Sequence, residues 1–189
     1  MYLFFDTETN GLPKRWGAPV NDLLNWPPLV QIAWMVYDDK IDLIKQKDVI
    51  IRPEGFKIDP MAAQIHGITQ EIADKEGIEL QPILEEFALD ISRSTTIVAH
   101  NIAFDEMIVG AEFLRKEIKH KLFQKERLCT MKESTDFCQI PGKRGYKWPK
   151  LQELHKKLFG YEFEEAHNAK ADINATAKCF WELRKRQIL

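Results

Sequence analysis

Apolar runs near the start of the chain predict β-strands. Tyr2 to Phe5 is continuously apolar, as expected for a strand buried on both faces. Leu29 to Tyr37 and Leu43 to Ile51 are typical of two further strands, the second ended by Arg52-Pro53. Together these runs predict a three-stranded meander.

Helical spacing of apolar residues begins after Pro53. Pro60 to Ile65 and Thr69 to Lys75 are expected to form short helices with a stop at Gly67 between them. A third helix is indicated by apolar residues at helical spacing, namely Ile83, Leu84, Phe87 and Ile91.

The second half of the chain predicts one short strand and three long helices. Thr96 to Ala99 is expected to be a buried strand that leads into a long helix. Lys147 to Phe159 predicts another helix, ended by Gly160, and the last runs from Ala169 to about Lys185. This order of elements describes a mixed α/β domain. The stripes expected to face the core are Phe104, Ile108, Ala111 and Ile118 in the first of these helices and Ile173, Ala177 and Phe180 in the last.

Length and cysteine usage favour one cytoplasmic domain. A chain of 189 residues suits a single domain, residues 1–189, that removes roughly 70% of its unfolded surface from water. Cys129, Cys138 and Cys179 are odd in number and lack the short spacing of a zinc site, so they are typical of thiols in a reducing compartment. No stretch approaches the roughly 18 apolar residues that span a bilayer.

Charge is spread unevenly along the chain. The net charge of −2 argues against a protein that holds nucleic acid by bulk electrostatics, but not against an enzyme acting on it. The segment Lys143 to Lys157 carries six basic residues against one acid, Glu153, and also holds Tyr146 and Trp148. Such a segment can guide a single strand by phosphate contact and stacking. A solvated loop and helix face is an equal alternative.

A proline-rich connection separates the first two predicted strands. Pro13 to Pro28 is long for such a connection and includes Trp16 and Trp26. Contact with a substrate and support of the sheet edge are equally good explanations of it.

Two carboxylates, Asp6 and Glu8, stand at the expected end of the first strand. Residues two apart on a strand point to the same side, so both face one point at the rim of the sheet. Asn10-Gly11 follows as a turn, and open α/β sheets place their ligands beyond such strand ends. The D-x-E pattern alone is weak, because a chain this acidic contains about one by chance.

Two further acids occur in matching frames, His100 to Asp105 (HNIAFD) and His167 to Asp172 (HNAKAD). In each, the Asn is expected to cap a helix and the Asp to fall on its first turn, where the helix dipole favours an anion. The His precedes the helix and can turn toward the same centre. Taken singly, each frame is better explained as an ordinary capped helix with an incidental acid.

The four carboxylates taken together indicate a metal site. Gathered without a cation they would repel, which raises their pKa values. Oxygen ligands without cysteine point to Mg²⁺ or Mn²⁺. Two such ions roughly 4 Å apart can hold a phosphodiester, one activating water and the other stabilising the departing 3′ oxygen. A neutral histidine can take the proton from that water, and spacing leaves both His100 and His167 open for this role.

These motifs resemble those of the DnaQ-like, or DEDDh, 3′→5′ exonucleases, which include the proofreading epsilon subunit of bacterial DNA polymerase III. The resemblance implies an RNase H-like fold, a mixed five-stranded sheet flanked by helices, with the second strand antiparallel to the first. It also implies release of nucleoside 5′-monophosphates from single-stranded DNA or RNA 3′ ends. The matching segments are Asp6 to Leu12 (DTETNGL), Ile65 to Thr69 (IHGIT), His100 to Asp105 and His167 to Asp172.

The resemblance also assigns roles to the acids and histidines. Asp6, Glu8 and Asp172 would hold the ion that carries the attacking water. Asp6 would bridge to the second ion, with Asp105 supporting it. His167 would be the general base, and His100 would be structural at the end of its strand.

Substrate contacts are implied as well, although core packing is an equal alternative for Phe104. A sister group of the family has a tyrosine at the position of Asn168, so this chain does not belong to that group. The implied substrate contacts are Thr9, Leu12, His66, Asn101 and Phe104.

Two features depart from the family pattern. The connection from Pro13 to Pro28 is longer than in compact members. The chain stops at Leu189, without the tail that fastens the epsilon subunit to its polymerase, which puts a polymerase partner in doubt. Other functions stay open, namely a silent nucleic-acid-binding module or a phosphodiesterase on small nucleotides. DNA and RNA present the same phosphodiester, so both stay open as substrates.

Overall fold

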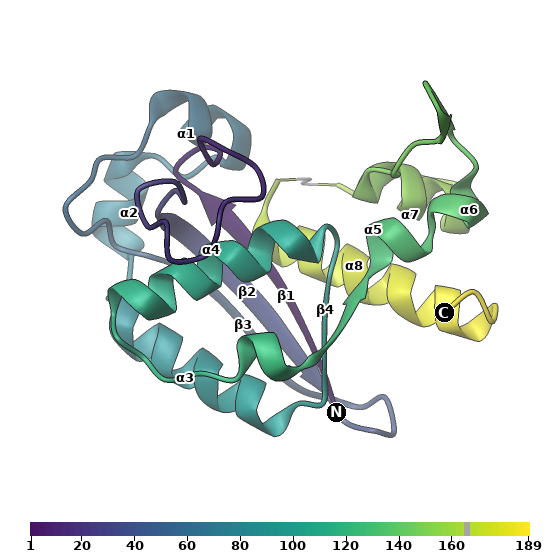
Figure 1. Ribbon diagram of the computed structural model, residues 1–189, viewed down its shortest axis with the longest axis horizontal. Helices are drawn as coiled ribbons and strands as arrows, with labels where there is room; N and C mark the ends of the chain where they lie inside the picture. The colour runs from purple at the N-terminus through teal and green to yellow at the C-terminus, as the bar shows by residue number, and fades with distance from the viewer. Residues whose placement is uncertain (165–166) are drawn as a thin grey trace.

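A mixed five-stranded sheet forms the centre of the molecule, seen in a computed structural model that describes residues 1–164 and 167–189 (Figure 1). The first three strands form the expected antiparallel meander, and the last two add in parallel beside the first. The strand order is β3-β2-β1-β4-β5, so β1 lies in the middle. The strands are β1 (Tyr2–Thr9), β2 (Leu29–Tyr37), β3 (Leu43–Ile50), β4 (Thr96–Ala99) and β5 (Glu126–Cys129).

Helices flank this sheet, as the resemblance implied. Within residues 1–164 and 167–189, no helix is long and apolar enough to cross a bilayer. The longer helices are α1 (Pro60–His66), α2 (Gln70–Glu76), α3 (Leu80–Arg93), α4 (Ile102–Arg115), α7 (Leu151–Phe159) and α8 (Ala169–Lys185). Between α4 and α7 lie η1 (Leu122–Gln124), α5 (Thr130–Glu133), α6 (Thr135–Cys138) and a small hairpin of β6 (Pro141–Gly142) and β7 (Gly145–Tyr146).

The two faces of the sheet are covered by different helices. Phe4 packs against Phe180 of α8, with ring centroids 5.1 Å apart. Its neighbour Phe5 packs against Phe87 of α3, at 5.6 Å. Figure 1 shows α8 on one side of β1 and both α3 and α4 on the other. Because side chains alternate along a strand, the even-numbered residues of β1 face α8.

The first strand is longer than its apolar run indicated. It continues past Phe5 to Thr9, and Asp6 pairs with Ala33 and Glu8 with Gln31 of β2. Both acids therefore lie on the strand itself, and their common orientation is fixed by the sheet.

Two helix boundaries also differ from the expectation. α7 begins at Leu151 and not at Lys147, because Pro149 disfavours a helical backbone at the residue before it. Lys150 is still extended, with φ −69° and ψ 158°. α4 ends at Arg115, so Ile118 lies beyond it, although Ile118 still packs against the core.

The expected helix ends and one start are confirmed. Gly67 and Gly160 end α1 and α7 in the left-handed conformation, at φ 77° and 85°. The Thr69 hydroxyl caps α2 by accepting a hydrogen bond from the backbone N–H of Ile72.

β5 was not expected from its own pattern, because Glu126 and Arg127 are exposed at the sheet edge.

Candidate active site

Three carboxylates converge at the junction of β1 and α8. Asp6 and Glu8 project from the face of β1 that α8 covers, and Asp172 lies in the first turn of α8. One oxygen of each lies within 4.8 Å of the others, and all three side chains are partly buried. The sequence predicts that these three carboxylates lie close together, and the structure confirms it.

The fourth carboxylate, Asp105, approaches from the other face of the sheet. Thr7 lies between the two acids of β1 and points the opposite way. Its backbone N–H and its hydroxyl both donate to Asp105 Oδ1, at 3.0 and 2.7 Å. Among the described residues, the group of carboxylates within 4.8 Å does not include Asp105. Its negative charge still raises the pKa of Asp6, so it contributes to the same field.

Burial raises the pKa values of all four acids, and repulsion from neighbouring carboxylates adds to this effect for Asp6, Glu8 and Asp105. Burial, and then the charges of Asp105, Asp172 and Glu8, hold the pKa of Asp6 well above its ordinary range. Burial and the charge of Asp172 raise the pKa of Glu8 to about 8. Burial also raises the pKa of Asp105 to about 7, against the two Thr7 hydrogen bonds, and that of Asp172 to about 6. Such a cluster favours a bound cation, because a cation removes the repulsion.

The donor set fits a hard divalent cation. All three converging ligands are carboxylate oxygens, which suit Mg²⁺ or Mn²⁺ better than softer metals. The cysteines take no part, since Cys129, Cys138 and Cys179 are free thiols buried elsewhere in the fold. The residues present therefore fit the metal centre that the sequence predicts.

The two histidines of the matching frames have different surroundings. Both ring nitrogens of His100 are engaged, Nε2 with the Pro149 carbonyl and Nδ1 with the Thr130 hydroxyl, each at 3.0 Å. Burial lowers the pKa of His100 to about 4, so the ring is neutral. His167 is exposed, in a left-handed conformation at φ 70°, and its backbone N–H donates to Asp172 Oδ2 at 3.0 Å.

The two asparagines of these frames also differ. Asn168 caps α8 as expected, since its side chain accepts from the backbone N–H groups of Lys170 and Ala171. The expectation that Asn101 caps α4 through its side chain is wrong. Asn101 is left-handed at φ 72°, and its side chain makes no capping bond to any described residue. The Asn101 amide is thus available to a ligand.

The other expected substrate contacts have varied surroundings. Leu12 is 73% exposed, whereas Thr9 is buried and its hydroxyl donates to the Gly11 carbonyl. His66 is also buried, and its Nδ1 accepts from the backbone N–H of Ile68. Phe104 is half-buried and packs both against the core and against Trp16, with ring centroids 5.9 Å apart.

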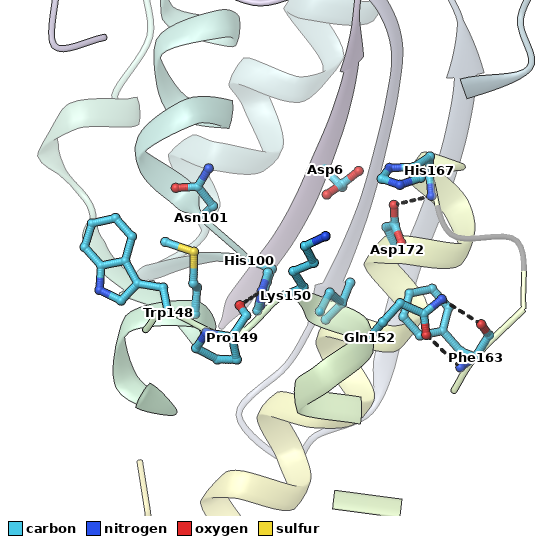
Figure 2. Close-up of a pocket in the computed structure, with 12 residues that line it drawn as sticks. Asp6, His100, Asn101, Trp148, Pro149, Lys150, Gln152, Phe163, His167 and Asp172 are labelled. Atoms are coloured by element: carbon cyan, nitrogen blue, oxygen red, sulfur yellow. Dashed lines mark hydrogen bonds between the residues drawn. The ribbon is translucent and has the colours of Figure 1, made fainter. Parts of the chain in front are cut away.

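A cavity of about 590 Å³ opens beside the carboxylates. Figure 2 shows Asp6 between Lys150 on one side and His167 and Asp172 on the other. Further residues line its α5 and α7 side, and the sequence indicated Trp148 and Lys150 among them only as members of the basic, aromatic segment Lys143 to Lys157. These further lining residues include Met131, Trp148, Lys150, Gln152 and Phe163.

Comparison with known proteins agrees with this geometry. An exonuclease family model of the RNase T type matches residues 3–180. The chain is 29% identical over 177 residues to the PolC-type DNA polymerase III of Streptococcus pneumoniae, which covers 94% of this chain and 11% of the polymerase. It is 31% identical over 118 residues to the PolC-type DNA polymerase III of Mycoplasmopsis pulmonis. This match covers 62% of this chain and 7% of that polymerase. The chain thus spans a small fraction of these relatives.

Solved structures share the fold. Escherichia coli exonuclease I in complex with a dT13 oligonucleotide has a TM-score of 0.72 and 23% identity, covering 98% of this chain and 41% of that one. Exonuclease I of Methylocaldum szegediense has a TM-score of 0.76 and 21% identity, covering 98% and 40%. The expected RNase H-like fold is confirmed. Because the family model matches nearly the whole length, this chain belongs to the DnaQ-like exonuclease family.

Proposed function

We propose that this chain is a metal-dependent 3′→5′ exonuclease that removes nucleoside 5′-monophosphates from single-stranded ends. The observation that carries the proposal is the meeting of Asp6, Glu8 and Asp172 within 4.8 Å beside an open cavity. Burial and repulsion of these acids lower the stability of the fold when they are ionised, and a bound cation would remove this effect. Membership of the exonuclease family supports phosphodiester hydrolysis as that use.

The carboxylates would hold two divalent cations, Mg²⁺ or Mn²⁺. Asp6, Glu8 and Asp172 would hold one of them, while Asp6, supported by Asp105, would hold the second. When bound, such a pair activates a water molecule and stabilises charge on the departing 3′ oxygen. Thr7 acts as a positioning residue, because its two hydrogen bonds fix the direction of the Asp105 carboxylate. A zinc-bound exonuclease I in complex with single-stranded DNA has the same fold and supports a metal-bearing site.

We assign proton transfer to His167 and a positioning role to His100. His167 is exposed at the cavity, and its bond from the backbone to Asp172 ties it to the carboxylates. It can therefore accept the proton of a water molecule held beside Asp172. His100 already bonds Thr130 and Pro149 through its two nitrogens, so it connects the strand β4 to the wall of the cavity.

Single-stranded DNA is the proposed substrate. Lys150 lines the cavity near Asp6 and supplies a positive charge for a phosphate (Figure 2). Leu12 is exposed on the segment after β1, where an unpaired base can pack on it. The likeness to exonuclease I bound to dT13 and to a segment of PolC-type polymerases supports DNA.

Three buried free thiols suit a reducing compartment, so we propose that the enzyme acts in the cytoplasm.

Degradation of an oligonucleotide labelled at its 5′ end tests the direction of attack. A 3′→5′ exonuclease gives a descending ladder that depends on Mg²⁺ or Mn²⁺ and stops when the 3′ end is blocked. Release of the labelled nucleotide at once would show attack from the 5′ end. Turnover of small nucleotide diesters without shortening of the oligonucleotide would instead make the chain a phosphodiesterase. Degradation of matched DNA and RNA strands in the same assay shows which of the two nucleic acids is the substrate.

A further inference from the structure

A second cavity, of about 480 Å³, adjoins the carboxylate cavity. The two have common walls, because Asn101, Met131 and Trp148 line both. Figure 2 shows Asn101 and Trp148 on the side of the first cavity opposite to His167 and Asp172. A strand bound at the carboxylates can therefore continue into the second cavity without leaving the protein.

Aromatic side chains dominate the walls of this second cavity. Trp16 and Trp148 are 60% and 59% exposed, which is unusual for the largest apolar side chain. Trp16 also contacts the ring of Phe104. Lys132 lies 5.8 Å from the ring of Trp148 and, among the described lining residues, is the one that carries a charge. Exposed flat rings beside one cation suit a nucleobase and its negatively charged backbone.

The connection that presents Trp16 is held firmly in place. Trp26 of the same connection is buried and donates from its indole N–H to the Pro19 carbonyl, at 3.0 Å. Arg115 of α4 donates to the carbonyls of Leu23 and Trp26, at 2.7 and 2.6 Å. The Pro13–Pro28 connection is thus anchored to α4 and to the core through Trp26, and its exposed Trp16 forms part of the cavity wall.

We propose that Trp16 and Trp148 form a stacking subsite for the base on the 5′ side of the scissile phosphate. The inference rests on the proposed function and deepens it. On this side the strand must continue beyond the site, and the hairpin just before Trp148 carries exposed Lys143 and Arg144, which can follow its phosphates. Asn101, with its side-chain amide free of the helix, lies where the two cavities join and can bond the linking nucleotide.

Binding of oligodeoxythymidylates with one base removed tests the subsite. Affinity is measured by anisotropy of a 5′ fluorophore, with the wild-type chain in excess EDTA. Loss of the penultimate base is expected to weaken binding by about tenfold, since stacking on an aromatic side chain contributes roughly that much. In the double variant W16L/W148L this penalty should vanish, while W16F should keep part of it. Removal of the terminal base should weaken binding by the same factor in wild type and in W16L/W148L.

Leu24→Ala is the matched control, because Leu24 lies in the same connection, is 84% exposed and does not line either cavity. It should keep the full penalty. The subsite is refuted if wild type binds intact and penultimate-abasic strands equally, or binds neither, or if W16L/W148L keeps the penalty. Cleavage in EDTA would appear as a decaying signal and would count against the proposed function, whereas the initial amplitude would still report the subsite.

Discussion

Side chains alternate along β1, so adjacent residues of this strand face opposite sides of the sheet and contact different carboxylates. Asp6 and Glu8 point to the face of α8, where Asp172 meets them. Thr7 points to the opposite face and holds Asp105 with two hydrogen bonds. A shift of one residue in the pairing with β2 would exchange these faces, so strand register is what assembles the site.

Thr7→Val tests the positioning role. Valine keeps the shape of the side chain but removes the hydroxyl donor to a buried carboxylate. We expect a loss of about 1–3 kcal/mol in the free energy of unfolding, measured in urea with metal present, together with lower kcat. Thr7→Ser keeps a hydroxyl and should restore most of both. Equal behaviour of the Val and Ser variants would contradict the role.

The raised pKa of Glu8 predicts how stability changes with pH. Folding raises this pKa from 4.5 to about 8, so the native state binds the proton more tightly. The associated stability is present at low pH and is lost as pH rises toward 8. In EDTA, the free energy of unfolding of wild type should therefore fall relative to Glu8→Gln between pH 5 and 8, by up to about 1.4 kcal/mol per pH unit.

The same reasoning predicts the effect of metal. A cation removes the repulsion, so Mn²⁺ should raise the melting temperature of wild type more at pH 8 than at pH 5, where protons compete with it for the carboxylates. Glu8→Gln should respond less. A melting temperature that is unaffected by Mn²⁺ at pH 8 would count against the metal centre.

The two histidines should respond differently to removal. For His167→Ala we expect turnover to fall by roughly 10²–10⁴-fold with metal binding and melting temperature unchanged, because the side chain is exposed. For His100→Ala we expect a lower melting temperature, because its bonds to Thr130 and Pro149 are lost. Kinetics and calorimetry of both variants check this. A harmless His167→Ala with a stable but inactive His100→Ala would reverse the assignment.

At the scale of elements, an ion pair within α4 supports the Pro13–Pro28 connection, because its Arg115 also donates to the carbonyls of Leu23 and Trp26. Glu112 is 3% exposed, accepts from the backbone N–H of Leu29, and pairs with Arg115, which also bonds the connection. Arg115→Met should cost about 3–5 kcal/mol of unfolding free energy, because it leaves a buried charge unpaired. Adding Glu112→Gln to it should recover part of this in urea titrations. Exposed Arg15→Met is the control and should have little effect.

Elements with local signals were the predictable ones. The helices ended by Gly67 and Gly160, and the start of α2 at Thr69, follow from backbone and capping chemistry within a few residues. β5 carries no such signal, because its place at the edge depends on pairing with β4. The extension of β1 to Thr9 likewise depends on β2, which lies twenty residues further along the chain.

At the scale of the whole molecule, the sheet brings together residues that are far apart in sequence. The motifs around Asp6, Asp105 and Asp172 were recognisable from the sequence, and the structure places them at one end of β1. In the rest of the cavity wall, Trp148 and Lys150 were indicated only as members of a basic, aromatic segment, and Phe163 carried no signal, because these residues reach the site only through tertiary packing. Trp16 and Trp26 lie in the same proline-rich connection, and only their tertiary surroundings distinguish the exposed Trp16 from the buried Trp26.

Hydrolysis at the carboxylate cluster can be tested with a single assay of strand shortening. Shortening of a 5′-labelled single strand is followed for wild type, Asp6→Asn and the surface control Asp136→Asn, each with Mn²⁺ or with EDTA. We predict a descending ladder for wild type and Asp136→Asn with Mn²⁺, and an intact strand for Asp6→Asn or in EDTA. Shortening that survives chelation, or that Asp6→Asn carries out at the wild-type rate, would show that the carboxylate cluster and its metal are not what hydrolyses the strand.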